Sequence, residues 1–213
     1  VAVAVVGTQA VVGLYELSNA NQTLKDVYEY NMQPVESLGK INVLMMENRT
    51  YLRVALSEVT VENEAKKPVL VMNQQIANDS ATAVEKNIEA INELWKGYIA
   101  TSMTSEEKSL ANKFASSRGN FVKEALKPAV ATLRAGHYDE TKAYAVKARE
   151  LYNIAGPDIT ALTKLQSDDA KKSYQAADSH YKTIQMLTFG GLAGAIAFLI
   201  WLGFIITHSV TKP

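Results

Sequence analysis

The feature that most constrains this chain is an uncharged, apolar run from Met186 to Ile206, close to the C-terminus. At a rise of 1.5 Å per residue, a helix of this length is roughly 30 Å long, which matches the hydrocarbon thickness of a bilayer. Residues 1–14 are also uncharged, but they are too few to span. We therefore interpret 186–207 as a second transmembrane helix and 1–14 as the end of a truncated first one.

The polar segment between these ends has the length of one domain, at 15–185, and predicts helices at about 15–60, 69–101, 105–135 and 138–185. A heptad-like stripe marks the first helix, with Leu38, Met45, Leu52 and Val59 seven residues apart and Ile41, Asn48 and Ala55 interleaved. The charged residues 62–68 predict the first turn, Thr104 predicts an N-cap and Gly136 a helix stop. We find no strand-like alternation. The expected class is all-α, an antiparallel up-down-up-down four-helix bundle continuous with transmembrane helices.

Composition excludes several classes of function. The 22 basic and 22 acidic residues give zero formal net charge, which argues against nucleic acid as a partner. The chain has no cysteine, so disulfides, zinc fingers and thiol catalysis are excluded, and its three histidines are too far apart for a metal triad. Asp168 and Asp169 have lysines within one helical turn, which indicates surface ion pairs. We therefore expect neither an enzyme active site nor a cofactor.

The arginines differ from the lysines in their neighbours. Most lysines have an acidic residue three or four positions away, as Lys40 has Glu36, whereas none of the five arginines does. Arg49 and Arg53 are instead each other's neighbour at a spacing of four. Two like charges on one helix face need an answering group, which another helix, water or an anionic ligand can supply.

Position along the helices favours a ligand. Arg49 lies about 35 residues beyond the first span, and Arg149 and Tyr152 lie about 35 residues before the second, so all three reach a similar height above the membrane. Arg118 lies roughly 9 Å nearer the membrane by the same count. The candidate ligand-binding residues are Arg49, Arg53, Arg149, Tyr152, Tyr144 and Arg118, with a small organic acid as the ligand. The alternative is that the arginines cover the bundle surface and the tyrosines belong to the core.

Three local motifs, in this order between and after two spans, carry a family resemblance. They are Asn48-Arg49-Thr50-Tyr51-Leu52-Arg53, Ala135-Gly136-His137-Tyr138-Asp139-Glu140 and Ser209-Val210-Thr211-Lys212-Pro213. With them, nearly the whole chain resembles bacterial chemoreceptors, the methyl-accepting chemotaxis proteins, and in particular their four-helix ligand-binding domain. Residues 208–213 resemble the entry to a HAMP signal-conversion module.

The resemblance implies a periplasmic sensor domain in the bacterial inner membrane, acting as a homodimer that binds ligand near the membrane-distal subunit interface. It also implies a piston-like shift of the second span, read by a cytoplasmic kinase and adaptor through a C-terminal region beyond this sequence. Arg49 matches the family's ligand arginine in the first helix. Val54 and Glu58 stand where the aspartate receptor has two further arginines, so the resemblance implies another carboxylate, such as a di- or tricarboxylic or an aromatic acid.

Two other readings stay open. A sensor histidine kinase or a cyclase carries the same kind of outer bundle. A membrane-anchored helical protein-interaction module is the second alternative, and it predicts that Arg49, Arg53 and Arg149 are solvent-facing and far apart.

Overall fold

The computed structural model describes residues 32–64 and 67–210, together with seven single residues between 13 and 25. The predicted first span at 1–14 (apart from Gly13), most of 15–31 and the linker residues 211–213 lie outside this part. The chain divides into two compact units, residues 29–168 and residues 1–28 with 169–213.

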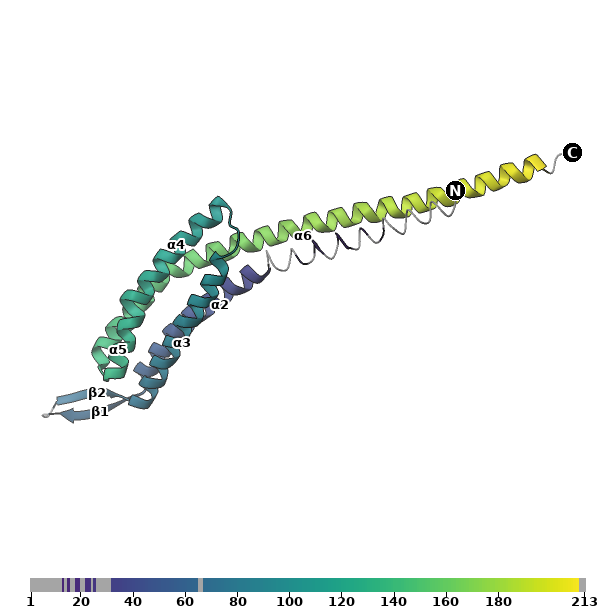
Figure 1. The fold of residues 1–213 in the computed structure, drawn as a ribbon. Helices are drawn as coiled ribbons and strands as arrows, with labels where there is room; N and C mark the ends of the chain where they lie inside the picture. The colour runs from purple at the N-terminus through teal and green to yellow at the C-terminus, as the bar shows by residue number, and fades with distance from the viewer. Residues whose placement is uncertain are drawn as a thin grey trace. The chain divides into compact units, whose positions relative to one another are not determined.

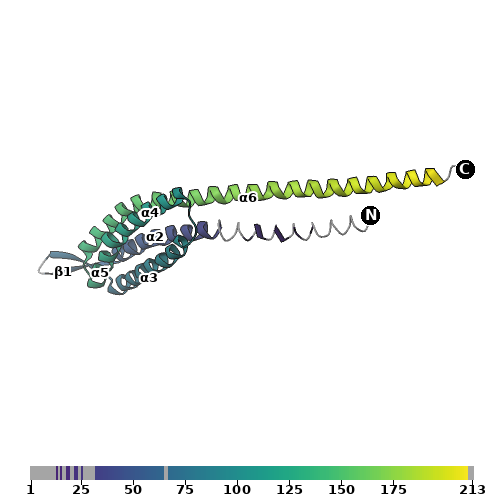
Figure 2. The same cartoon turned by 45° about the horizontal axis from the view of Figure 1, so that its top comes forward.

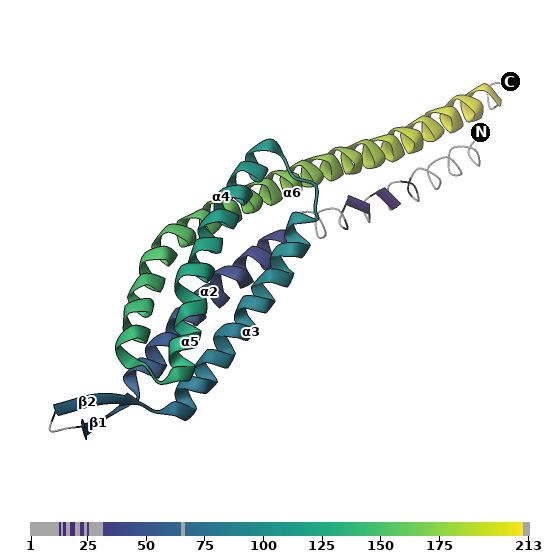
Figure 3. The ribbon, with the colours of Figure 1, turned by 60° about the vertical axis from the view of Figure 1, so that its left-hand side comes forward.

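Unit 29–168 is a bundle of four helical segments (Figure 1). They are α2 (Gln33–Ser57), α3 (Gln74–Ile99), a third made of α4 (Ser105–Phe121), η2 (Val122–Leu126) and α5 (Lys127–Ala135), and the first part of α6 (Tyr138–Val210). Figure 3 shows these segments packed side by side along their length. The all-α class and the four-helix bundle are confirmed.

The stripe on the first helix forms one wall of the core. Leu38, Ile41, Met45, Leu52 and Ala55 are at most 1% exposed. Facing them are buried residues of the other segments, among them Ala81, Val84 and Ile91 of α3 and Phe114 and Phe121 of α4. Burying a large apolar side chain contributes about 1.5–3 kcal/mol, so this seam between the helices is what holds the bundle together.

Two helix ends lie where they were predicted, at Thr104 and Gly136. The Thr104 hydroxyl accepts a hydrogen bond from the backbone N–H of Glu107 at 3.2 Å, which makes Thr104 the N-cap of α4. Gly136 ends α5 in the left-handed conformation with φ at 74°. The Gln74 amide of α3 donates to the carbonyls of Leu133 and Arg134, so α3 also caps the end of α5.

A β-hairpin replaces the first predicted turn. β1 (Val59–Glu64) and β2 (Lys67–Met72) pair antiparallel, with Val59 opposite Met72 and Glu64 opposite Lys67. The predicted helix to Thr60 and the predicted helix start at Val69 are therefore wrong. The physical reason is the content of valine and threonine at 59–61 and 69–71, because β-branched residues favour a pleated strand over a helix.

The third segment is not the single α-helix that was predicted for 105–135. It widens at η2, where the N–H of Lys127 bonds the carbonyl of Val122 five residues back. Pro128 explains the wide turn, because its ring has no N–H and would clash with the carbonyl of residue 124 in a regular helix.

The second unit contains the rest of α6, which Figure 2 shows as a continuous helix. α6 is the one helix among residues 32–64 and 67–210 that is long and apolar enough to cross a membrane, and its most apolar window has a mean hydropathy of 2.3 and no buried residue. It covers the predicted span at 186–207. Within the bundle, α6 contains Pro157.

Candidate functional site

Tyr152 and Arg49, both predicted site residues, lie together between α6 and α2. The Arg49 guanidinium carbon stands over the Tyr152 ring, 4.6 Å from its centroid. This is a cation–π contact, in which the negative face of the ring attracts the positive charge. The sequence predicts a similar height for these two residues, and in the structure their side chains are in contact.

Two further contacts and a neighbouring glycine hold the Tyr152 ring in place. Its hydroxyl donates to Asn42 Oδ1 at 3.0 Å, and the Phe121 ring meets it edge-on with the centroids 6.3 Å apart. Gly156, one turn further along α6, leaves room for the ring, since a Cβ there would lie 3.2 Å from Tyr152 Cε1. Asn42 precedes Arg49 by two turns on the same face of α2, so Tyr152 contacts α2 at two levels.

The electrostatics of this pair favour an anion. Burial raises the pKa of the Tyr152 hydroxyl, and the nearby Arg49 charge only partly opposes the shift, so the phenol is neutral and donates a hydrogen bond at physiological pH. Arg49 is half-buried and makes no ion pair within the described part of the chain. The ring contact uses its charge but not its N–H groups, which remain available for a carboxylate.

Arg53 and Arg149 are both exposed, and no ion pair with another described residue neutralises either of them. α2 runs toward the hairpin and α6 runs away from it (Figure 3). Arg53 is thus about 6 Å beyond Arg49 and Arg149 about 4.5 Å beyond Tyr152, both toward the hairpin. The two offsets along the helices are similar, and a shared role for the four side chains remains a prediction.

The other predicted residues lie elsewhere. Tyr144 packs against the hydrophobic core, as Tyr152 also does, which agrees with the alternative given for the tyrosines. Arg118 lies on α4 and donates to Asn92 Oδ1 of α3 at 2.8 Å, away from the contacts that Tyr152 makes. Arg134 forms an ion pair with Glu85 of α3, so a carboxylate on another helix neutralises this arginine.

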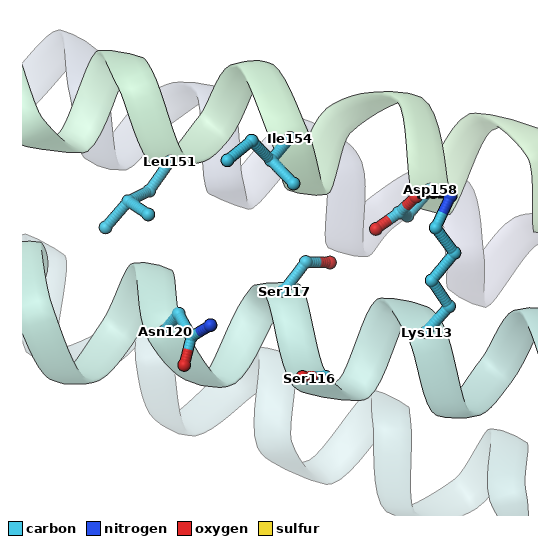
Figure 4. A pocket seen from close by; sticks show the side chains of 7 residues that line it. All are labelled: Lys113, Ser116, Ser117, Asn120, Leu151, Ile154 and Asp158. Atoms are coloured by element: carbon cyan, nitrogen blue, oxygen red, sulfur yellow. Dashed lines mark ion pairs between the residues drawn. The ribbon is translucent and has the colours of Figure 1, made fainter.

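A separate cavity of about 390 Å³ lies between α4 and α6 (Figure 4). Leu151 and Ile154 line one end, and the buried Asp158 closes the other with an ion pair to Lys113 at 2.9 Å. The cavity contains none of the predicted site residues. The buried Asp158 Oδ2 has no hydrogen-bond partner among the described residues, so this cavity favours a hydrogen-bond donor over an anion.

Sequence reasoning missed Asn42, Gly156 and Phe121, which position Tyr152. Two of them have a signal in the sequence: Asn42 lies seven residues before Arg49, and Gly156 lies four residues after Tyr152, so each shares a helix face with its partner. Phe121 has none, because its contact crosses from α4 to α6. The interaction-module alternative agrees with the exposure of Arg53 and Arg149 but not with the half-buried Arg49.

Comparison with known families identifies the domain. The family model described as Tar ligand binding domain homologue matches residues 2–170. A search among curated proteins found no match to this sequence. The matched range contains the whole bundle described above and every residue of the candidate site.

Proposed function

Because the chain belongs to the family of Tar ligand-binding domain homologues, the non-catalytic sensor domains of chemoreceptors, we propose that it senses a small carboxylate. The sensor domain would lie in the periplasm, with α6 crossing the bacterial inner membrane. The output would be chemotaxis, through a HAMP region, a kinase and an adaptor on the cytoplasmic side. The apolar part of α6 is the element of the described chain that suits the crossing.

The observation that carries the proposal is the half-buried Arg49, stacked on Tyr152 without an acidic partner among the described residues. A guanidinium that has lost part of its water gains from a carboxylate that offers two parallel acceptors. Hydrogen bonds to charged groups contribute about 1.5–3 kcal/mol each, enough for micromolar to millimolar binding when two or three combine.

The arrangement also bears on the ligand class. Arg53 and Arg149 lie one turn from the Arg49–Tyr152 pair in the same direction, so a ligand with two or three carboxylates matches the charges better than a monoanion. An aromatic acid is the other candidate, since the Tyr152 ring offers a stacking surface. We propose a di- or tricarboxylic acid first and an aromatic acid second.

A second copy of the chain would complete the site. Val43, Met46 and Val54 of α2 are 53%, 51% and 42% exposed and lie within one stripe of the helix surface. At about 100° per residue, Arg53 falls between this stripe and Arg49. Two copies packed along the apolar stripe would therefore place their arginines at the edge of the interface, where a ligand can contact both subunits.

The signal would travel along α6, which runs without interruption from Tyr138 to Val210 and includes both Tyr152 and the apolar segment. A ligand shifts such a receptor only if it binds two arrangements of the helices with different affinity. We propose that contact with Arg49 and Arg149 changes the position of α6 relative to α2.

The test is a thermal-shift panel on the full chain in lipid nanodiscs, with succinate, malate, citrate and benzoate against their uncharged amides. A bound acid at 100 times its Kd should add about 2.7 kcal/mol, or about 8 °C in Tm. Arg49→Gln should weaken acid binding at least about 10-fold. Lys108→Gln, which removes an exposed charge of α4, should leave acid binding unchanged. If no acid shifts the parent and Arg49→Gln melts like it, the carboxylate site is wrong.

The proposed homodimer has its own test, because the chain has no cysteine of its own. Met46→Cys should form a disulfide-linked dimer under mild oxidation, and Lys96→Cys, exposed on α3, should stay monomeric. Equal crosslinking of the two variants would contradict the proposed interface.

A further inference from the structure

A second groove lies on the bundle between α3 and the third helical segment, with a volume of about 810 Å³. Arg118 of α4, Lys123 of η2 and Lys127 of α5 line it from one side. Asn92 and Glu89 line it from α3. We call it the Arg118 groove; it contains none of the residues of the Arg49–Tyr152 pair.

The charge of Arg118 is poorly compensated within the described part of the chain. Its Nε is buried and has no hydrogen-bond partner among the described residues, and its Nη1 donates to the neutral Asn92 amide at 2.8 Å. Burial lowers the pKa of Arg118, because leaving water disfavours the charged form. Since a guanidinium stays protonated in proteins, its charge persists and attracts an anion into the groove.

The π-helical turn brings a second cation to the same groove. Nine residues separate Arg118 from Lys127, which in a regular helix would place them about 180° apart around the axis. The additional residue in the wide turn at η2 reduces this angle to about 80°, so both side chains line one groove. The wide turn that Pro128 causes thus brings Lys127 to the same groove as Arg118.

The acidic residues of the groove do not cancel these charges. Glu85 also lines it, but its carboxylate is paired with Arg134. Glu89 is then the remaining acid opposite Arg118, Lys123 and Lys127 among the lining residues. We propose that the Arg118 groove is a second anion site, which binds a small multivalent anion through Arg118 and Lys127. It is independent of the proposed carboxylate site at Arg49.

The test is titration calorimetry of the full chain in nanodiscs of uncharged lipid, at physiological ionic strength, in an Arg49→Gln background that removes the other site. Citrate and inorganic phosphate are the probes, one for a carboxylate ligand and one for a phosphate ligand. At least one should bind with one site per chain. Arg118→Gln should weaken that binding about 10- to 100-fold, and Lys127→Gln should also weaken it.

Lys108→Gln is the matched control, because it removes a positive charge of α4 outside the groove. Its binding should equal that of the background. The proposal is overturned if neither probe binds at concentrations that saturate a site with a Kd of about 1 mM. It is also overturned if Arg118→Gln and Lys127→Gln, both checked for an intact melting transition, bind like the background, or if Lys108→Gln weakens binding equally.

Discussion

Replacing Asn48 with leucine should stabilise the bundle, although most substitutions in a protein core are destabilising. Asn48 lies on α2 in the middle of the buried stripe and is 0% exposed. Neither its amide nitrogen nor its amide oxygen has a hydrogen-bond partner among the described residues. The folded protein therefore carries a desolvated amide that gains nothing in return.

The expected magnitude follows from the size and chemistry of the two side chains. Asparagine and leucine have the same branching of non-hydrogen side-chain atoms, but the leucine methyl groups are larger than the amide oxygen and nitrogen, so overpacking takes back part of the gain. Removing an unsatisfied buried amide relieves about 1–3 kcal/mol. At about 3 °C per kcal/mol for a domain of this size, Asn48→Leu should raise Tm, by about 9 °C at most.

Tryptophan fluorescence can follow the transition within the bundle. The chain has two tryptophans, and a Trp201→Phe background leaves Trp95, which is 7% exposed in the core of the bundle. Melting curves of the full chain in nanodiscs would be compared with and without Asn48→Leu. Leu52→Ala, one turn along the same stripe, is the control and should lower the free energy of unfolding by about 2–5 kcal/mol.

A lower Tm for Asn48→Leu would refute the reasoning. It would mean that the amide is satisfied in the assembled receptor, by water or by a second subunit, and that its loss removes a real hydrogen bond. Asn48→Ala separates this case from simple misfit, because it removes the amide but adds no methyl groups. If Asn48→Ala were as destabilising as Leu52→Ala, a polar partner for the amide would be the explanation.

Three further outcomes follow from particular contacts. Gly156→Ala should push the Tyr152 ring by a few tenths of an ångström and weaken acid binding in calorimetry, while an unchanged Kd would contradict the role of this glycine. Gly136→Ala should cost about 1–2 kcal/mol in thermal unfolding, because φ is +74° there. Lys147 lowers the pKa of the Glu124 carboxyl, so their ion pair stabilises the fold above the unfolded pKa and is lost as pH falls through the folded pKa. The Tm difference between the parent and Glu124→Gln should therefore shrink in acid. A Tm difference that stays constant with pH would exclude the ion pair as its source.

The bundle was largely predictable because its signals are local or periodic. The stripe from Leu38 to Ala55, the Thr104 cap and the Gly136 stop all depend on residues within a few turns of each other. The hairpin was not, since a short two-stranded ribbon is only marginally stable alone and its sequence signal is weak beside the charged residues of its turn. The wide turn at η2 has a visible cause in the sequence, because Pro128 cannot continue a regular helix.

The candidate site was predictable only in part. Counting residues from each span placed Arg49 near Tyr152, because the rise of a helix is nearly constant. The same sequence could not reveal that Arg134 has a partner, since Glu85 lies on another helix and spacing within a helix says nothing about it. Which atoms meet, such as the Tyr152 hydroxyl and Asn42, depends on side-chain rotation, and no helical period encodes that.

Pro157 gives α6 an uneven stiffness next to Tyr152. It has no N–H to offer the carbonyl of residue 153, so one of the bonds that tie successive turns of α6 together cannot form there. A sideways force on Tyr152 should therefore bend α6 most easily at the turn between residues 153 and 157. The neighbouring hydrogen bonds of the same turn still resist a force along the helix axis. The helix should therefore transmit an axial displacement better than a change of tilt.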